Sequence, residues 1–164
     1  MKTASQTVLS FPHDPPIFLD SGPLSMVTNP KANGTTLECQ LWLDFQIRQG
    51  AIVFVPEIAD YEVRRELIRA GKQRSVQQLD QLKTVLAYVP ITTEMILKAA
   101  ELWAIVRQQG QPTADPMSLD GDVILAAQAI TIAQQIQQEV IIATTNVGHL
   151  SRFTIAQHWQ TITP

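Results

Sequence analysis

Five polar side chains in this chain lie just after an apolar segment or near the start of a helical pattern. They are Asp20, Glu62, Asp120, Asp122 and Asn146. Asp20 closes the apolar run 17–19, and Asn146 follows the apolar run 140–144. Carboxylates brought close together cannot all stay ionised without a cation, and Mg²⁺ and Mn²⁺ prefer such oxygen ligands. If folding gathers these side chains, the sequence predicts a divalent metal site and metal-dependent chemistry on phosphate.

Apolar runs alternate with helical patterns, and this alternation determines where the acids would lie. Strands are predicted at 16–20, 51–55, 87–90 and 140–144, with a last one at 161–163. Helices are predicted at 23–27, from Thr35 or Thr36 to Gly50, at 57–70, from Ser75 to Leu86, at 94–109, and from Asp120 or Gly121 to Gln138. Parallel strands joined by helices place their carboxyl ends at one edge of the sheet. The sequence therefore predicts an α/β fold, a three-layer α/β/α sandwich with a mostly parallel central sheet.

Two segments carry further structural expectations. Pro90 places the strand 87–90 at an edge, because proline would remove a ladder hydrogen bond in the middle of a sheet. In the helix 94–109 the apolar period turns Ile96 and Trp103 toward the interior.

Length and composition are those of one globular domain. The chain has 164 residues, of which 45% are hydrophobic and 16% charged, enough to bury a core. We expect a tail at 1–15 and a single domain at 16–164. The stretch 123–133 is too short to span a bilayer, and residues 1–15 do not resemble a signal peptide. The single Cys39 excludes an internal disulfide, and the helical pattern around it buries the thiol. A cytoplasmic protein without a membrane partner is predicted.

A basic run stands out against a net charge of −3. It contains Arg64, Arg65, Arg69, Lys72 and Arg74, with only Glu66 among them. One interpretation is a solvated helix face and loop, and the other is a rim that contacts phosphates beside the acids.

Each acid also has an ordinary structural explanation. Asp20 could be a turn or cap residue, Asp120 could cap a helix, and Glu62 lies early in its helix. Separate caps do not explain why polar groups recur after successive strands, whereas one shared site does. His149 and His158 form no zinc-binding spacing, so His149 is expected to be an exposed loop residue, with contact to the substrate phosphate as the alternative.

Four short motifs resemble the PIN-domain family of metal-dependent ribonucleases, most closely bacterial VapC-like toxins. They are Phe18-Leu19-Asp20-Ser21, Tyr61-Glu62-Val63-Arg64-Arg65-Glu66-Leu67, Asp122-Val123-Ile124-Leu125-Ala126-Ala127, and the segment 143–153 that contains Thr144-Thr145-Asn146. Their order and spacing are similar to those of the family from about residue 17 to residue 153.

The resemblance implies an endoribonuclease that leaves 5′-phosphate and 3′-hydroxyl ends and uses Mg²⁺ or Mn²⁺. It assigns Asp20, Glu62 and Asp122 to the catalytic metal-binding core. It implies that Asp120 and Asn146 are auxiliary ligands or hold metal-bound waters. Together with the basic run it suggests RNA contacts at Ser21, Arg64, Arg65 and Arg69. It also implies a homodimer and a small antitoxin as protein partner. The chain departs from the family pattern at Gly22, where Asn is usual, and at position 146, which is Asn and not Asp.

Other functions compete with this one. Phosphatases of the haloacid-dehalogenase type need Asp-x-Asp at the first strand, and Asp20-Ser21-Gly22 lacks the second acid. Toprim-type metal sites need an acid pair at a strand end, whereas 120–122 is predicted to open a helix. A catalytically weak or inactive module that binds RNA or a protein partner stays open as the second class.

Overall fold

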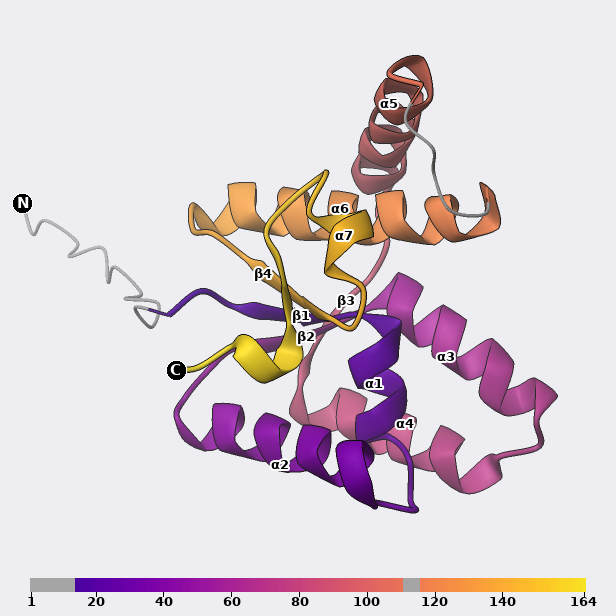
Figure 1. Cartoon of the computed structure of the whole chain (residues 1–164), viewed down its shortest axis with the longest axis vertical. Coiled ribbons are helices and arrows are strands. Elements are labelled where there is room, and N and C mark those ends of the chain that lie inside the picture. The colour runs from indigo at the N-terminus through magenta and orange to yellow at the C-terminus, as the bar shows by residue number, and fades with distance from the viewer. Residues whose placement is uncertain (1–13, 111–115) are drawn as a thin grey trace, which may run out of the picture.

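A parallel sheet of five strands forms the centre of the computed structural model (Figure 1), which describes residues 14–110 and 116–164. The strands are β1 (Ile17–Leu19), β2 (Val53–Pro56), β3 (Ala87–Val89), β4 (Ile141–Thr144) and β5 (Ala156–His158). Their order across the sheet is β3-β2-β1-β4-β5, and every neighbouring pair is parallel. The three-layer α/β/α fold is confirmed, with a fully parallel sheet. Most of the predicted tail at 1–15 lies outside the described residues.

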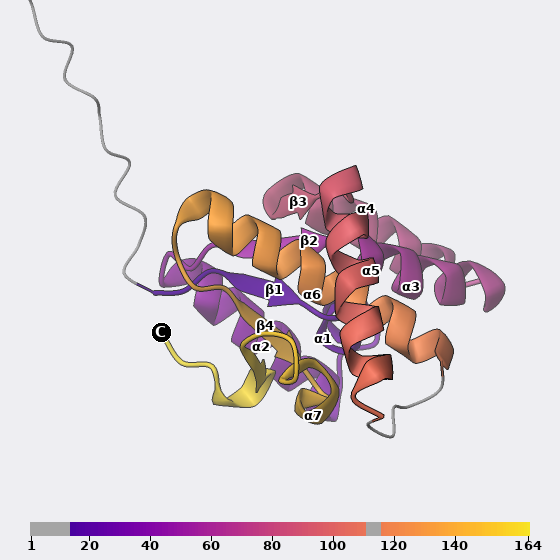
Figure 2. The ribbon, with the colours of Figure 1, turned by 90° about the horizontal axis from the view of Figure 1, so that it is seen from above.

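Helices cover both faces of the sheet. They are α1 (Ser21–Val27), α2 (Gly34–Arg48), α3 (Glu57–Arg69), α4 (Gln73–Val85), α5 (Thr93–Gln108), α6 (Pro116–Ile136) and α7 (Val147–Leu150), with a 3-10 turn η1 at Trp159–Thr161. In Figure 1, α1 to α4 lie on one side of the strands and α6 on the other. Figure 2 shows α5 lying across α6 on the outer side of that layer.

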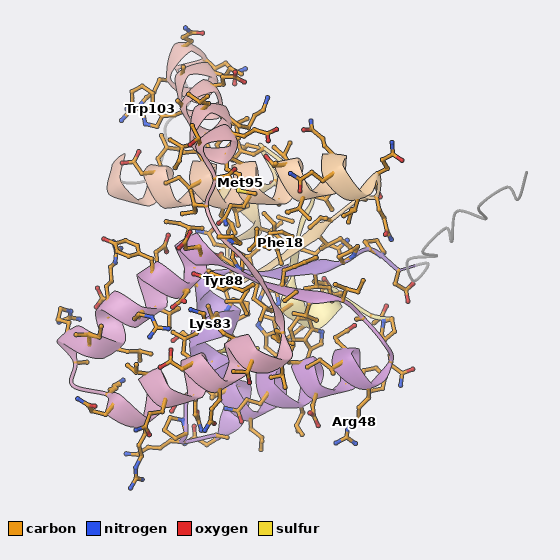
Figure 3. The ribbon with its side chains drawn as sticks, turned by 180° about the vertical axis from the view of Figure 1, so that it is seen from behind. Phe18, Arg48, Lys83, Tyr88, Met95 and Trp103 are labelled. Atoms are coloured by element: carbon orange, nitrogen blue, oxygen red, sulfur yellow. The ribbon has the colours of Figure 1, made fainter. Side chains whose placement is uncertain are left out.

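Alternation along β1 explains the two cores. Ile17 and Leu19 pack with α1 to α4, whereas Phe18 packs with α5 and α6. Figure 3 shows Phe18 between the sheet and α6. All three side chains are almost completely buried, as expected for the central strand of a sheet with helices on both faces. Asp20 stands at the end of this fixed strand, so its backbone position is well defined.

Two predicted boundaries were wrong. Helix α6 begins at Pro116 and not at Asp120 or Gly121, because proline fits the first turn of a helix, where its missing N–H is not needed. The last strand is Ala156–His158 and not 161–163, since residues 159–161 form the 3-10 turn. The expected edge strand at 87–90 is confirmed as β3, which lies at one end of the sheet.

Apolar side chains remain exposed on two helices. Along α2, Leu37, Leu41 and Phe45 form a stripe with four-residue spacing, and each is at least 42% exposed. On α5, Ile96 and Trp103 are also exposed, so their predicted inward position was wrong. Both lie beside a groove between α5 and α6 that Val123 and Ile124 also line.

No described helix combines the length and the apolar character that crossing a membrane requires.

Candidate active site

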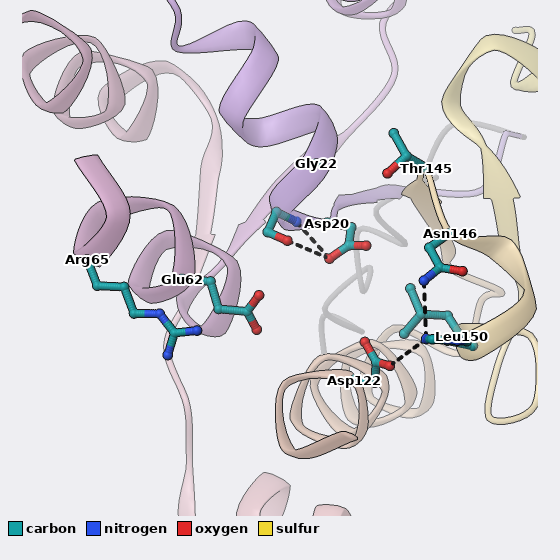
Figure 4. A pocket seen from close by; sticks show the side chains of 10 residues that line it. Asp20, Gly22, Glu62, Arg65, Asp122, Thr145, Asn146 and Leu150 are labelled. Carbon is teal, nitrogen blue, oxygen red and sulfur yellow. Dashed lines mark hydrogen bonds and ion pairs between the residues drawn. The ribbon is translucent and has the colours of Figure 1, made fainter. Parts of the chain in front are cut away.

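Three carboxylates from distant parts of the chain line one cavity of about 320 Å³, called here the acid cavity. Asp20 follows β1, Glu62 lies in the second turn of α3, and Asp122 lies in the second turn of α6. Figure 4 shows the three side chains pointing toward one another from these elements. The other lining residues are Ser21, Gly22, Arg65, Thr145, Asn146, His149 and Leu150. Folding therefore brings Asp20, Glu62, Asp122 and Asn146 together, as predicted.

Asp20 is held by hydrogen bonds to both carboxylate oxygens. The backbone N–H of Ser21 donates to Oδ1 at 2.7 Å, so Asp20 caps α1. The Thr144 hydroxyl donates to Oδ2 at 2.7 Å and accepts from the Asn146 N–H at 2.9 Å. Thr144 is completely buried at the end of β4, the strand that pairs with β1. One hydroxyl thus fixes the position of Asp20 and the backbone of Asn146.

Glu62 depends on a close approach between α3 and α6. Gly121 lies beside it, and a Cβ at that position would overlap Glu62 Oε1. The glycine leaves the space that the Glu62 carboxylate occupies. Gly22 plays a similar part on α1, because a Cβ there would come within 2.8 Å of Thr145 Oγ1. Thr145 therefore fills the place where the family's usual Asn would extend from position 22.

Gly121→Ala should reduce RNA cleavage by about 10- to 100-fold, because the added methyl displaces the Glu62 carboxylate from its position. Stability should be unchanged or slightly raised, since alanine is favoured over glycine inside a helix. The measurement is cleavage rate alongside a urea unfolding curve. Gly148→Ala is the matched control, because a Cβ there meets no atom within 4 Å. Equal activity in the two variants would contradict the role given to Gly121.

Asp122 is connected to the β4 side of the cavity through an imidazole. His149 Nδ1 lies 3.6 Å from Asp122 Oδ2 and 3.1 Å from Asn146 Nδ2. His149 lies in α7 and lines the cavity, so the expectation of an exposed loop histidine was wrong. The contact places a titratable group between a carboxylate and an amide of the site.

The acid cavity carries concentrated negative charge. Burial, and after it the charge of Asp20, raise the pKa of Asp122 to about 6, against the opposing effects of His149 and Arg152. Burial and the charge of Asp20 also raise the pKa of Glu62, while Ser21 and Arg65 oppose the change. A nearby cation stabilises the ionised form of carboxyl groups whose pKa is raised in this way.

Asp122→Asn should make the metal-free protein more stable at pH 7.5, by on the order of 2 kcal/mol. The pKa of Asp122 is about 6 in the folded chain, above the ordinary value of 3.8, so protonation stabilises the folded state. The advantage of the variant should shrink as pH falls through 6 and disappear near 4, where the unfolded chain also binds the proton. Urea unfolding in a chelating buffer at several pH values measures it. A wild-type protein that is the more stable at pH 7.5 would contradict this electrostatic account.

The donor set fits a hard divalent ion held partly through water. Within residues 14–110 and 116–164, no group of three His, Cys, Asp or Glu side chains could hold a metal ion directly. Mg²⁺ usually keeps several waters and binds through one or two carboxylates. Asp20, Glu62 and Asp122, with the Asn146 amide, offer oxygen atoms around a cavity with room for such waters.

Some of the other predicted site residues lie away from the acid cavity. Asp120 is exposed and lines the apolar groove between α5 and α6 instead. Arg64 pairs with Asp60 and Asp80 at 2.8 Å each, on the side of α3 that faces α4. Arg65 lines the acid cavity, and Arg69 lines a neighbouring groove.

Sequence reasoning missed the parts that Thr144 and Thr145 play in the site, and it placed His149 beside the substrate phosphate only as the alternative to an exposed loop residue. The available signal for Thr144 was a hydroxyl at the last position of the most hydrophobic strand, where an apolar residue would be expected. Cys39 does not line the acid cavity; it is buried, as predicted, and burial raises the pKa of its thiol to about 12.

No protein-family model and no curated protein sequence matches the chain. Solved structures do. VapBC2 from Rickettsia felis, bound to a DNA fragment from its promoter, matches with a TM-score of 0.65 at 16% identity, over 87% of this chain and 98% of that chain. DNA-bound VapBC from Salmonella typhimurium matches with a TM-score of 0.61 at 14% identity, over 89% and 99%.

A third structure is the VapC toxin from Mycobacterium tuberculosis that cleaves the sarcin-ricin loop. It matches with a TM-score of 0.56 at 14% identity, over 85% of this chain and 96% of that chain. The likeness extends over nearly the full length of each of these structures. The chain therefore has the PIN-domain fold of VapC-like proteins, as the motifs predicted.

Proposed function

We propose that this chain, which has the PIN-domain fold, is an endoribonuclease that uses Mg²⁺ or Mn²⁺ to hydrolyse RNA, leaving 5′-phosphate and 3′-hydroxyl ends. The observation that carries the proposal is the convergence of Asp20, Glu62 and Asp122 on one cavity from three separate elements. The VapC toxin from Mycobacterium tuberculosis that shares the fold cleaves the sarcin-ricin loop, an RNA substrate.

The residues of the cavity have distinct parts in this reaction. A bound Mg²⁺ or Mn²⁺ would offset the charge of the phosphate oxygens and lower the pKa of a water. Asp20, Glu62, Asp122 and Asn146 would hold the ion. Three carboxylates alone would repel an RNA phosphate, so the substrate requires such a cation. Thr144 keeps the Asp20 carboxylate in place during the reaction, through its hydrogen bond of 2.7 Å.

RNA contacts would start at the rim of the acid cavity. Arg65 lines the cavity on the α3 side, and its guanidinium stacks over the Tyr61 ring at 5.1 Å from the ring centroid. Ser21 lies at the start of α1 and faces the same cavity. A guanidinium beside an exposed aromatic ring can bind phosphate and stack with a base.

A protein partner of the antitoxin kind would cover exposed apolar surface. The stripe of Leu37, Leu41 and Phe45 on α2 offers one such surface. The Rickettsia felis and Salmonella typhimurium structures are VapBC complexes. A homodimer would use further surface of the same character, such as the groove beside Ile96 and Trp103.

The test of the proposal combines cleavage with metal binding. Incubation of total RNA with Mn²⁺ should yield fragments that accept an adaptor requiring a 5′-phosphate, and a chelator should prevent their formation. Mn²⁺ should also raise the melting temperature, because binding to the folded state adds about 2.7 kcal/mol at a hundredfold excess over Kd. A protein that neither cleaves nor shifts its melting temperature would instead be the catalytically inactive module that binds RNA or protein.

A further inference from the structure

A groove leads from the acid cavity to a second hollow at the start of α4. The groove shares Ser21, Glu62 and Arg65 with the acid cavity. It continues past Arg69 to Lys72. Lys72 also lines the second hollow, a cavity of about 430 Å³ called here the α4 pocket. A continuous path along one side of α3 therefore joins the carboxylates to the α4 pocket.

The α4 pocket is lined by groups that bind anions. Lys31, Lys72 and Arg74 line it, and among residues 14–110 and 116–164 none of the three forms an ion pair with an acid. No carboxylate lines this pocket. In a chain with a net charge of −3, three cations without acidic partners around one hollow are suited to an anionic ligand.

The first residues of α4 line the α4 pocket, so their backbone amides are a further source of hydrogen-bond donors beside it. The 13-residue helix begins at Gln73, and its N-cap residue Lys72 makes no side-chain capping bond. The Gln73 N–H donates to Gly71 O and the Val76 N–H donates to Lys72 O, whereas the N–H groups of Arg74 and Ser75 have no backbone acceptor. Free amides at a helix N-terminus, together with the helix dipole, bind phosphate.

Ser75 supplies a separate indication of a ligand. The residue is only 4% exposed and lines the α4 pocket. In the described part of the chain, its hydroxyl makes no hydrogen bond with another protein group. The hydroxyl is not one of the side-chain atoms that are enclosed without a partner, so its open side is the hollow, where it is available to a ligand.

We infer that the α4 pocket is a phosphate subsite for the RNA strand bound in the acid cavity, which rests on the proposed function. Lys31, Lys72 and Arg74 bind one backbone phosphate of the strand, and the Ser75 hydroxyl and the amides of α4 donate hydrogen bonds to it. Arg65 and Arg69 bind the strand between the two cavities. The basic run predicted from the sequence is therefore divided. Arg64, partly buried against Asp60 and Asp80, is structural. Within the described ranges Arg69 pairs only with the exposed Glu66, and it contacts RNA together with Arg65, Lys72 and Arg74.

The distance along α3 between the acid cavity and the α4 pocket sets the shortest RNA strand that reaches the subsite. The seven residues from Glu62 to Arg69 span about 10 Å of helix. A stacked strand advances about 3.4 Å per nucleotide. The subsite phosphate therefore lies at least three nucleotides from the carboxylates. A trinucleotide bound at the acid cavity is too short to use the subsite, whereas a ten-nucleotide strand reaches it.

The experiment measures binding of mixed-sequence, single-stranded RNA of three and ten nucleotides. The Asp122→Asn full chain is used in Mg²⁺, so that cleavage does not interfere. Adding Lys72→Ala or Arg74→Ala should weaken binding of the longer strand about tenfold and of the trinucleotide less than twofold. Each charge removed should reduce the slope of log affinity against log salt by about 0.7. Ser75→Ala should weaken the longer strand severalfold, and inorganic phosphate should shift the amide NMR signals of Arg74 and Ser75.

Arg107→Ala is the matched control, because Arg107 lies on α5, on the other side of the sheet, and stacks on Trp103. It should leave binding of both strands unchanged. Equal losses for the two lengths, or no loss with Lys72→Ala and Arg74→Ala, would overturn the subsite and leave the nuclease proposal intact. Failure of both lengths to bind to the Asp122→Asn chain and to the wild-type chain alike would overturn both. Melting curves of each variant establish that the comparison is between folded proteins.

Discussion

Asp122→Asn or Asp20→Asn should reduce metal-dependent RNA cleavage by about 10²- to 10⁴-fold. Each substitution removes one of the three carboxylates that line the acid cavity. For Asp20 there is a further cost, because both of its oxygens accept hydrogen bonds, from Ser21 N–H and from the Thr144 hydroxyl. In Asp20→Asn, an amide NH₂ replaces one of these oxygens and would then face the group that donates a hydrogen bond to it. The measurement is single-turnover cleavage of a labelled RNA, with metal concentration varied so that weaker ion binding is separated from slower chemistry.

Asp120→Asn is the matched control for both variants. It makes the same chemical change two residues from Asp122, on an exposed side chain that lies beside the α5–α6 groove. Cleavage should stay within about twofold of the wild type. If Asp20→Asn or Asp122→Asn retained full activity, the metal-assisted mechanism would be wrong. If Asp120→Asn lost as much activity as Asp122→Asn, the auxiliary role suggested by its motif would be restored.

Asp60→Ala should lower the free energy of unfolding by about 3–5 kcal/mol. Asp60 is 3% exposed and accepts from Arg64 Nε at 2.8 Å and from Lys83 Nζ at 2.7 Å. Lys83 also lies 4.2 Å from the centroid of the Tyr88 ring, and Figure 3 shows the two side chains beside each other. Removal of Asp60 leaves two partly buried cations without their shared partner. Urea unfolding of the metal-free protein measures the change.

Asp44→Ala provides the comparison. Asp44 also pairs with an arginine four residues away, Arg48, at 2.8 Å, but its side chain is 60% exposed. Exposed pairs of this kind contribute about 0.3–0.5 kcal/mol. A loss below about 1 kcal/mol for Asp60→Ala would show that the cluster around it is solvated and does not hold α3 to α4.

The sheet could be predicted from the sequence because its central strands are apolar on both faces. The runs 17–19 and 140–144 are continuous hydrophobic segments, as strands of a buried parallel sheet are. Strand β5, Ala156–His158, could not be found in this way, since it lies at an edge and two of its three residues are polar. Its place depends on backbone pairing with β4, and hydropathy does not report backbone pairing.

The motifs of the candidate site could be predicted from the sequence. The direction in which each side chain points could not, because it depends on where each helix starts. Asp120 and Asp122 are two residues apart, which is about 200° around a helix with 3.6 residues per turn. Once α6 is known to start at Pro116, only one of the two acids can face the sheet. Arg64 and Arg65 are separated in the same way, by about 100°. Arg64 therefore turns to Asp60 and Asp80, and Arg65 turns to the acid cavity.

The hydrogen bond between Asp20 and Thr144 joins positions 124 apart in the sequence. The acid cavity is thus complete only when β4 has been synthesised and has inserted beside β1. A ribosome adds about 5–20 residues per second, so an incomplete chain exists for several seconds without the acid cavity. Under the proposed function, the growing polypeptide therefore cannot cut RNA until β4 has left the ribosome, which is itself rich in RNA.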